Sequence, residues 1–247
     1  MDIFPQAAAR ARRRISLWKA QSVFRQALED PFYAVRLQQA GLGSAGAIGA
    51  ARSIESLLGS LPCAGLAVYR KARPDLRCHY PETVAHPLFP RLSASQPKNF
   101  RTRYPALAGP LGLLQHLARL HPDYRIRARF AVLVLRGPGD RDVTGSDRNL
   151  LWEAFQVPVS EAFIGFDGEL LAWECEARCG MHVNAGAVFE DFGGQIYFTS
   201  LSDREQPSIR LETGLSGRQL PGPCECGRPG PRLSGTAEPG AFSSAAD

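Results

Sequence analysis

The stretch that decides the fold lies in the C-terminal third, where LLAWECEARCGMHV spans residues 170–183 and CECGRPGPRL spans residues 224–233. Between them, short apolar runs are separated by turn-forming residues such as Gly193 and Gly194, which predicts short β-strands. The expected strands cover residues 170–175, 188–189, 195–201 and 208–212. This part of the chain therefore predicts a β-rich subdomain over residues 161–232.

The residues before this stretch predict a βαβ unit. The apolar run 129–135 is short and rich in β-branched residues, which favours a buried strand. Ser146 or Asp147 can cap the helix that follows, and residues 157–159 are expected to form the returning strand. An amphipathic helix is expected over residues 111–120, just before the unit.

The N-terminal segment, residues 1–62, predicts helices and few strands. Apolar periodicity and capping residues place the helices at residues 7–29, 32–40 and 53–61. The Gly- and Ala-rich stretch 41–50 indicates a loop. Numerous prolines in residues 62–110 argue against long helices or central strands there.

The expected fold class is therefore α/β, with four segments along the chain. N-terminal helices occupy residues 1–62, and a short parallel α/β layer lies within residues 63–160. A β-rich, distorted barrel-like subdomain covers residues 161–232. The tail, residues 233–247, is rich in Ser, Gly, Ala and Pro and is expected to be disordered.

Composition excludes several classes of protein. The 247 residues are 44% hydrophobic and 21% charged, which is typical of a soluble globular chain. No apolar run approaches the roughly 20 residues of a membrane helix, and arginines at residues 10–14 interrupt any signal-peptide core. The net charge of +5 is scattered, and no nucleic-acid motif accompanies the basic clusters at 10–14 and 125–129. We expect a cytoplasmic protein with neither a membrane nor a nucleic acid as partner.

Four residues form a candidate metal site: Cys175, His182, Cys224 and Cys226. Thiolate and imidazole are the ligands that Zn²⁺ prefers, and four of them complete a tetrahedral structural site. Cys179 lies between the first two and could replace either. Two alternatives remain open, since cysteines are also common as buried thiols and a thiol in such a cluster could be reactive.

The C-terminal motifs resemble the end of the large domain of phenylacetate-CoA ligase-type adenylate-forming enzymes. The resemblance rests on the stretches quoted above together with FED at 189–191, IYFTSL at 196–201 and QPSIRLETG at 206–214. It implies an ancestral fold that binds ATP, forms an acyl adenylate and transfers the acyl group to CoA. Some members of the family carry cysteine and histidine at similar places.

The resemblance also implies where a nucleotide would bind. The family's adenine motif, Tyr-Gly-x-Thr-Glu, corresponds here to residues 163–169, which keep Gly165 and offer Asp167 or Glu169 as acids. Arg210 stands where the family has an arginine, and its alternative role is an ion pair with Glu190 or Glu212. Where the family has the ribose-binding Asp of Thr-Gly-Asp, this chain has Leu215.

The departures from the family shape the functional expectation. The sequence has no stretch that matches the family's glycine-rich phosphate loop, and we expect the family's C-terminal domain, which supplies a catalytic lysine, to be missing as well. We therefore expect a degenerate, non-catalytic binding or accessory module that does not bind ATP, AMP or Mg²⁺ and that has an unknown protein partner. The alternative is a ligase-derived enzyme that still binds AMP, CoA or an acyl adenylate. A truncated gene product is the third possibility.

Overall fold

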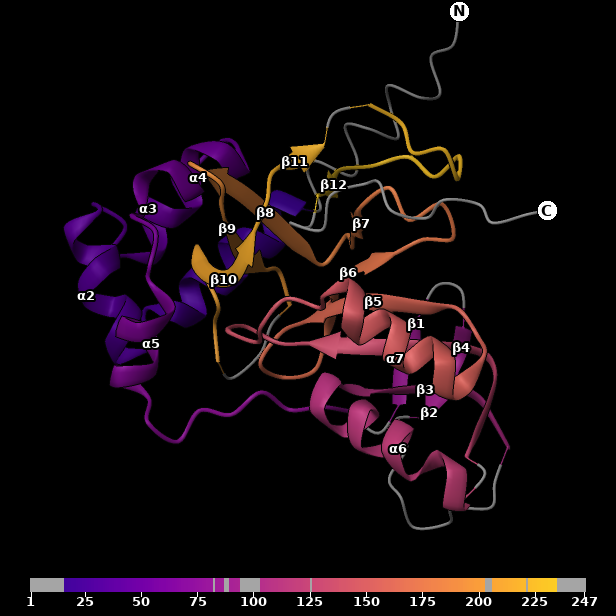
Figure 1. Ribbon diagram of the computed structural model, residues 1–247. Helices are drawn as coiled ribbons and strands as arrows, with labels where there is room; N and C mark the ends of the chain where they lie inside the picture. Colours follow the sequence, from indigo (N-terminus) through magenta and orange to yellow (C-terminus); the bar gives the residue numbers. More distant parts are fainter. Residues whose placement is uncertain are drawn as a thin grey trace, which may run out of the picture. The chain divides into compact units, whose positions relative to one another are not determined.

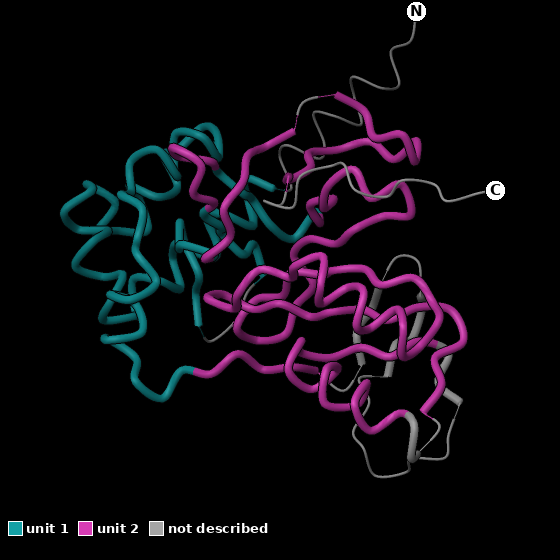
Figure 2. The backbone as a smooth tube through the Cα atoms, viewed as in Figure 1, with its two compact units in different colours: residues 1–76, 185–190, 197–213 teal, residues 77–184, 191–196, 214–247 magenta. Residues whose placement is uncertain are grey.

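The computed structural model describes residues 16–81, 83–86, 89–93, 103–124, 126–202, 206–220 and 222–234. The chain divides into two compact units that are interleaved in sequence (Figure 2). The first unit contains residues 1–76, 185–190 and 197–213, and the second contains residues 77–184, 191–196 and 214–247. Each unit is described separately below.

Helices make up most of the first unit. A helix over residues 16–27 is followed by α2 (Pro31–Gln39), α3 (Ala45–Ala50), α4 (Ile54–Ser60) and α5 (Leu66–Ala72). Asp30 caps α2 by accepting hydrogen bonds from the amides of Phe32 and Tyr33, and Ser53 forms a capping box at α4. The predicted helices 32–40 and 53–61 are confirmed.

Two helices of the first unit were not expected from the sequence. The stretch 41–50 was predicted as a loop, but its second half is α3, because Ser44 accepts a hydrogen bond from the amide of Ala47 and starts a helix rich in alanine. Helix α5 lies in the region where prolines obscured the pattern, and it fits before Pro74. In both cases a short helix formed where glycine or proline suggested none.

A seven-stranded sheet organises the second unit, with the strand order β11-β12-β7-β6-β5-β4-β3 (Figure 1). The strands are β3 (Arg103–Pro110), β4 (Arg127–Arg136), β5 (Val159–Ile164), β6 (Leu170–Glu174), β7 (Met181–Val183), β11 (Gln219–Leu220) and β12 (Arg232–Leu233). Strands β3, β4 and β5 are mutually parallel, and the remaining pairs are antiparallel. Pro105 is tolerated because β3 is at the edge of this strand order.

Helices α6 (Leu111–Tyr124) and α7 (Gly145–Phe155) lie side by side on one face of this sheet (Figure 1). They pack on alternate residues of β4, including Val132 and Val134, whereas Leu133 and Leu135 face the opposite core. The crossover from β4 through α7 to the parallel strand β5 confirms the predicted βαβ unit.

The N-cap of α7 was predicted wrongly. Neither Ser146 nor Asp147 is the cap; Thr144 is, and it accepts a hydrogen bond from the amide of Asp147. Asp147 instead occupies the third helical position, and its carboxylate accepts a hydrogen bond from the amide of Thr144. The capping box therefore begins at Thr144, two residues before the first of the predicted caps.

Two smaller sheets complete the described strands. One pairs β1 (Thr83–His86) with β2 (Phe89–Ser93), and the other has the order β10-β9-β8, with β8 at Ala187–Phe192, β9 at Gln195–Ser200 and β10 at Leu211–Ser216. The strand predicted at 208–212 begins three residues later than expected. Arg210 has a φ of 46°, and this left-handed conformation interrupts extended backbone.

The mixed α/β class is therefore confirmed, while the predicted segment boundaries at residues 62, 160 and 232 stay predictions. The start of the first predicted helix, the basic residues 10–14 and the predicted disordered tail from residue 235 onward lie outside the described residues. Among the described residues, no helix has the length and apolar character that crossing a membrane requires.

Candidate functional site

Strand pairing in the second unit brings the four predicted metal ligands together. Cys175 directly follows β6, and His182 lies in β7 opposite Trp173 of β6. Cys224 and Cys226 lie between β11 and β12, and β12 pairs with β7 at His182. As a result, the three sulfur atoms and an imidazole nitrogen all lie within 4.8 Å of one another. We refer to these four residues as the cysteine cluster.

The spacing of the cysteine cluster fits a tetrahedral zinc ion. The Sγ atoms of Cys175 and Cys224 are 3.6 Å apart, and Cys226 Sγ is 3.3 Å from His182 Nε2. Bonds of about 2.3 Å to sulfur and 2.0 Å to nitrogen place the ligands of such an ion about 3.5 to 3.8 Å apart. Modest adjustment of the side chains would therefore accommodate zinc.

The surroundings of His182 favour the neutral imidazole that a metal requires. Burial and the positive charges of Arg228 and Arg232 lower the pKa of His182. The ring stacks on Trp173 at a centroid distance of 5.3 Å, and Arg228 lies over the indole of Trp173. Trp173 thus fixes the plane of the imidazole beside the thiols.

The cysteine thiols differ in acidity. Burial opposes ionisation of Cys226, but hydrogen bonding from the backbone and side chain of Arg228 and from the Cys224 thiol lowers the pKa of Cys226 to about 7. Burial, together with the thiol of Cys179, raises the pKa of Cys224 to about 12. A cation bound among these sulfurs would favour the thiolate at both positions.

Cys179 lies close to the cluster but outside the set of four that converge. Its Sγ atom is 3.0 Å from Cys224 Sγ. That separation is shorter than the roughly 3.8 Å between two thiolates on one tetrahedral zinc ion. The geometry therefore favours the set without Cys179 over either set in which Cys179 replaces Cys175 or His182.

The structure also brings together three of the four predicted nucleotide-binding residues. Gly165, Asp167 and Glu169 occupy the turn between β5 and β6, which we call the 165–169 turn. The amide of Gly165 donates to the carbonyl of Glu169 at 2.8 Å, and the amide of Glu169 donates to Asp167 Oδ1 at 3.0 Å. Both acids are therefore part of a turn that one backbone hydrogen bond and the side chain of Asp167 stabilise.

The 165–169 turn is covered by residues 78–81 of the same unit. The amide of His79 donates to the carbonyl of Phe166 at 2.7 Å. Gly168 has a φ of 82°, and a Cβ placed there would lie 2.8 Å from the carbonyl oxygen of His79 and 2.9 Å from Pro81. Only glycine fits this approach without a shift of the backbone.

Arg210 belongs to the first unit, and its guanidinium is held by protein groups there. It forms a bidentate ion pair with Glu190, with distances of 2.9 and 3.0 Å, and it also donates to the carbonyls of Leu58 and Leu61. Of the two carboxylates considered from the sequence, Glu190 is the partner. Glu212 instead accepts from the amide of Leu66 at 2.9 Å.

Leu215 is the residue that the sequence resemblance placed at the position of a ribose-binding aspartate. It lies in β10, and only 6% of its surface is exposed. A buried leucine has no acceptor for a ribose hydroxyl, so this position offers packing rather than recognition.

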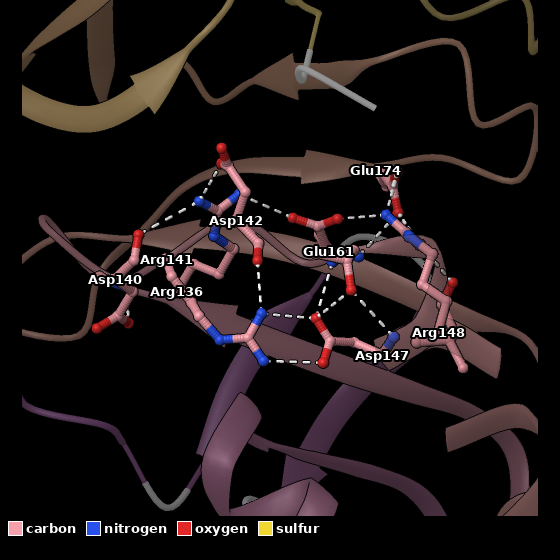
Figure 3. A network of polar contacts seen from close by, with 11 residues as sticks. Arg136, Asp140, Arg141, Asp142, Asp147, Arg148, Glu161 and Glu174 are labelled. Atoms are coloured by element: carbon pink, nitrogen blue, oxygen red, sulfur yellow. Dashed lines mark hydrogen bonds and ion pairs between the residues drawn. The ribbon is translucent and has the colours of Figure 1, made fainter. Parts of the chain in front are cut away.

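The second unit contains another polar region, which we call the charge network and which the sequence did not predict (Figure 3). Its guanidinium groups belong to Arg136, Arg141 and Arg148, and its carboxylates belong to Asp142, Asp147, Glu161 and Glu174. These residues are separated along the chain, so no local motif indicates that they meet. Only the alternation of β4 and β5 beneath α7 could have suggested it.

Each carboxylate of the charge network is paired with an arginine. Arg136 bonds Glu161 at 3.0 Å and Asp142 at 2.6 Å. Arg148 pairs with Glu161 and with both oxygens of Glu174, at 2.9 and 3.1 Å. Burial, followed by the nearby charge of Glu174, raises the pKa of Glu161 despite these partners. The network joins α7 to the sheet through charges rather than through apolar contacts.

Comparison with known proteins identifies a fold but no family. No family profile and no curated protein matches this chain. An open conformation of 2-hydroxyisobutyryl-CoA ligase, in complex with 2-HIB-AMP and CoA, aligns with a TM-score of 0.61 and 16% identity, covering 91% of this chain and 69% of that chain. The postadenylation state of that ligase with 2-HIB-AMP gives the same TM-score and identity, over 91% and 67%.

At this identity the likeness shows the fold alone. The chain has part of the fold of the adenylate-forming enzymes, as the resemblance implied. The finer prediction, kinship with phenylacetate-CoA ligase, stays a prediction. The expectation that nucleotide binding is lost also stays a prediction.

Proposed function

We propose that this chain is a reduced relative of the adenylate-forming CoA ligases and acts as a binding or accessory module, with an unidentified protein as partner. Its fold matches part of such a ligase over 91% of its length. The proposed compartment is the cytoplasm, because the cysteines in the described part of the chain form no disulfide with one another, which is typical of a reducing compartment.

The observation that carries this proposal is the state of the expected nucleotide site. The acids of the 165–169 turn take part in a turn covered by residues 78–81, and Arg210 is bound by Glu190 and two carbonyls. The place of the ribose-binding acid holds the buried Leu215. We infer that Asp167, Arg210 and Leu215 serve the fold, and that their side chains are therefore poorly suited to bind a nucleotide.

The cysteine cluster fits a structural role in the same account. Three thiols and one imidazole fill the four positions of tetrahedral zinc, so no position remains for water or substrate. Bound there, zinc would join β6, β7 and the segment before β12. We therefore propose that zinc stabilises the C-terminal part of the second unit rather than taking part in catalysis.

One observation favours a second function. The solved ligases of this fold are in complex with 2-HIB-AMP and CoA. A chain that keeps the fold could keep a site for AMP, CoA or an acyl adenylate, with Gly165, Asp167, Glu169 and Arg210 as the candidate contacts.

Calorimetric titration of the full chain with ATP, AMP and CoA, with magnesium present, distinguishes the two functions. The accessory-module proposal predicts no binding tighter than about 100 μM, which corresponds to about −5.5 kcal/mol. Tighter binding of any of these ligands would contradict it.

A substitution then locates any binding that is found. Asp167→Asn keeps the oxygen that accepts from the Glu169 amide but removes the charge. Glu153→Gln, on the exposed side of α7, is the matched control. Binding weakened by the first variant alone would place the ligand at the 165–169 turn and support the enzyme reading.

A further inference from the structure

Cys224 has two sulfur neighbours of different kinds. Its Sγ atom lies 3.6 Å from Cys175 Sγ, a spacing that suits two ligands of one zinc ion. The second neighbour, Cys179 Sγ, lies at 3.0 Å, which is too close for that role. The closer pair needs to shorten by only about 1 Å to reach the length of about 2.05 Å that a disulfide has.

The backbone around Cys179 holds this approach in place. Residues 175–178 form a turn in which the amide of Arg178 donates to the carbonyl of Cys175 at 3.0 Å. Arg232 Nη1 donates to the carbonyl of Cys179 at 2.7 Å. At Gly180, with a φ of 105°, a Cβ would lie 2.5 Å from the carbonyl oxygen of Leu233, so the chain is packed tightly against β12. Cys179 therefore faces Cys224 from a fixed turn.

We propose that Cys179 and Cys224 form a redox-active pair, and that closing their disulfide removes Cys224 from the metal. The metal-bound and disulfide states are then mutually exclusive, because one sulfur cannot serve both. This inference rests on the proposed zinc centre. It gives a role to Cys179, which is not one of the four proposed zinc ligands.

Hydrogen peroxide is a sufficient oxidant for this step. The thiolate of Cys179 attacks one peroxide oxygen, the O–O bond breaks, and hydroxide leaves and is protonated to water. The thiolate of Cys224 then attacks the Cys179 sulfenic sulfur, forming the S–S bond and expelling a second hydroxide. Two electrons pass from the two sulfurs to peroxide, and Zn²⁺ is released without a change in its oxidation state.

The test follows zinc and thiols together in the full zinc-loaded chain. Peroxide is added, zinc release is recorded with a chromogenic chelator, and the oxidised protein is alkylated and mapped by peptide mass spectrometry. We expect zinc release to accompany a peptide pair joined through Cys179 and Cys224. A thiol reductant with added zinc should restore the bound metal.

Two variants make the test specific. Cys179→Ser should keep its zinc and release it at least about tenfold more slowly under peroxide, because the attacking thiol is gone. Cys63→Ser, which changes a cysteine of the first unit, should behave like the unaltered chain. If Cys179→Ser fails to fold, peptide mapping of the oxidised unaltered chain still shows which two cysteines are joined.

The outcomes separate this inference from the proposal on which it rests. A chain that contains no zinc before oxidation would overturn both. Zinc that stays bound after the disulfide has formed, release that is equally fast in Cys179→Ser, or a mapped disulfide between Cys175 and Cys226 would overturn this inference and leave the zinc centre intact.

Discussion

The cysteine cluster and the charge network are both buried polar regions of the second unit, but they differ in what completes them. The network sets carboxylates against guanidinium groups, so each carboxylate has its counter-charge within the chain. The cluster gathers donors of electron pairs and contains no cation of its own to which all four could bind. The comparison shows that a cluster of buried polar side chains indicates a bound ligand only where the side chains cannot neutralise one another's charges or complete one another's hydrogen bonds.

The largest effect is expected from breaking the cysteine cluster. Cys175→Ser should abolish stoichiometric zinc binding and lower the free energy of unfolding by about 5 kcal/mol, because binding energy at a structural zinc site is folding energy. Denaturant unfolding with metal analysis of the same sample measures both. Cys63→Ser is the control, and equal destabilisation by the two substitutions would contradict a metal role for Cys175.

The charge network should respond to the loss of one carboxylate, whatever the metal content. Glu161→Gln leaves the guanidinium groups of Arg136 and Arg148 short of a counter-charge in a buried place, and we expect a loss of about 3 kcal/mol. The control, Glu153→Gln on the exposed side of α7, should change stability by less than about 0.5 kcal/mol. Urea unfolding compares the two, and similar values would show that the network contributes little.

The 165–169 turn resembles the charge network in that its polar groups are hydrogen-bonded to other groups of the protein. Gly168→Ala should cost about 3 kcal/mol, combining a left-handed residue with the close approach of His79 and Pro81. Gly193→Ala also has a positive φ but meets open space, so it should cost only about 1 kcal/mol. Thermal unfolding measures the stability of both variants, and the difference between them gives the contribution of the close packing at Gly168. An equal loss of stability would show that residues 78–81 do not pack closely on the turn.

The smallest expected effect concerns Asp147, a buried carboxylate whose partner Arg141 lies at the exposed edge of the network. The side-chain hydrogen bond from Arg141 is the main cause that holds the pKa of this carboxyl well below its usual range. A depressed pKa in the folded state stabilises the protein above the unfolded pKa of about 4, and that contribution is lost as the pH falls toward the folded value. Because Arg141 is 57% exposed, solvent screening limits the cost of Asp147→Asn to about 1 kcal/mol at pH 7.

The pH dependence provides the check on Asp147. Urea unfolding of the unaltered chain and of Asp147→Asn at pH 7 and near pH 3 should give a stability difference that shrinks at the lower pH. A difference that is independent of pH would mean that the ionised carboxylate contributes nothing beyond its hydrogen bonds.

Sequence patterns predicted the features whose residue types form a recognisable pattern. The apolar run 129–135 and the helix after it gave the βαβ unit, and the spacing of cysteine and histidine gave the four cluster residues. Local chemistry was also misjudged where signals competed, since glycines at 41–50 concealed the helix that Ser44 caps. The predicted caps of α7, Ser146 and Asp147, lie two and three residues after the observed cap, Thr144, because all three residue types can cap a helix.

The sequence did not predict features that join distant residues of ordinary types. Glu161 and Glu174 appear as ordinary strand residues, and only the alignment of β5 and β6 beneath α7 places both beside Arg148. The cover formed by residues 78–81 over Gly168 joins segments some 90 residues apart. Arg210 was offered as a nucleotide contact, whereas its tertiary partners are Glu190 and two carbonyls.

Metal analysis of the chain, purified without chelator, tests the central distinction between the two polar regions most directly. If the cysteine cluster is completed by an added ion, the protein should contain about one zinc ion per chain, and removing it should unfold or loosen the C-terminal part of the second unit. A folded chain that contains no metal, and that gains no stability when zinc is added, would contradict the account.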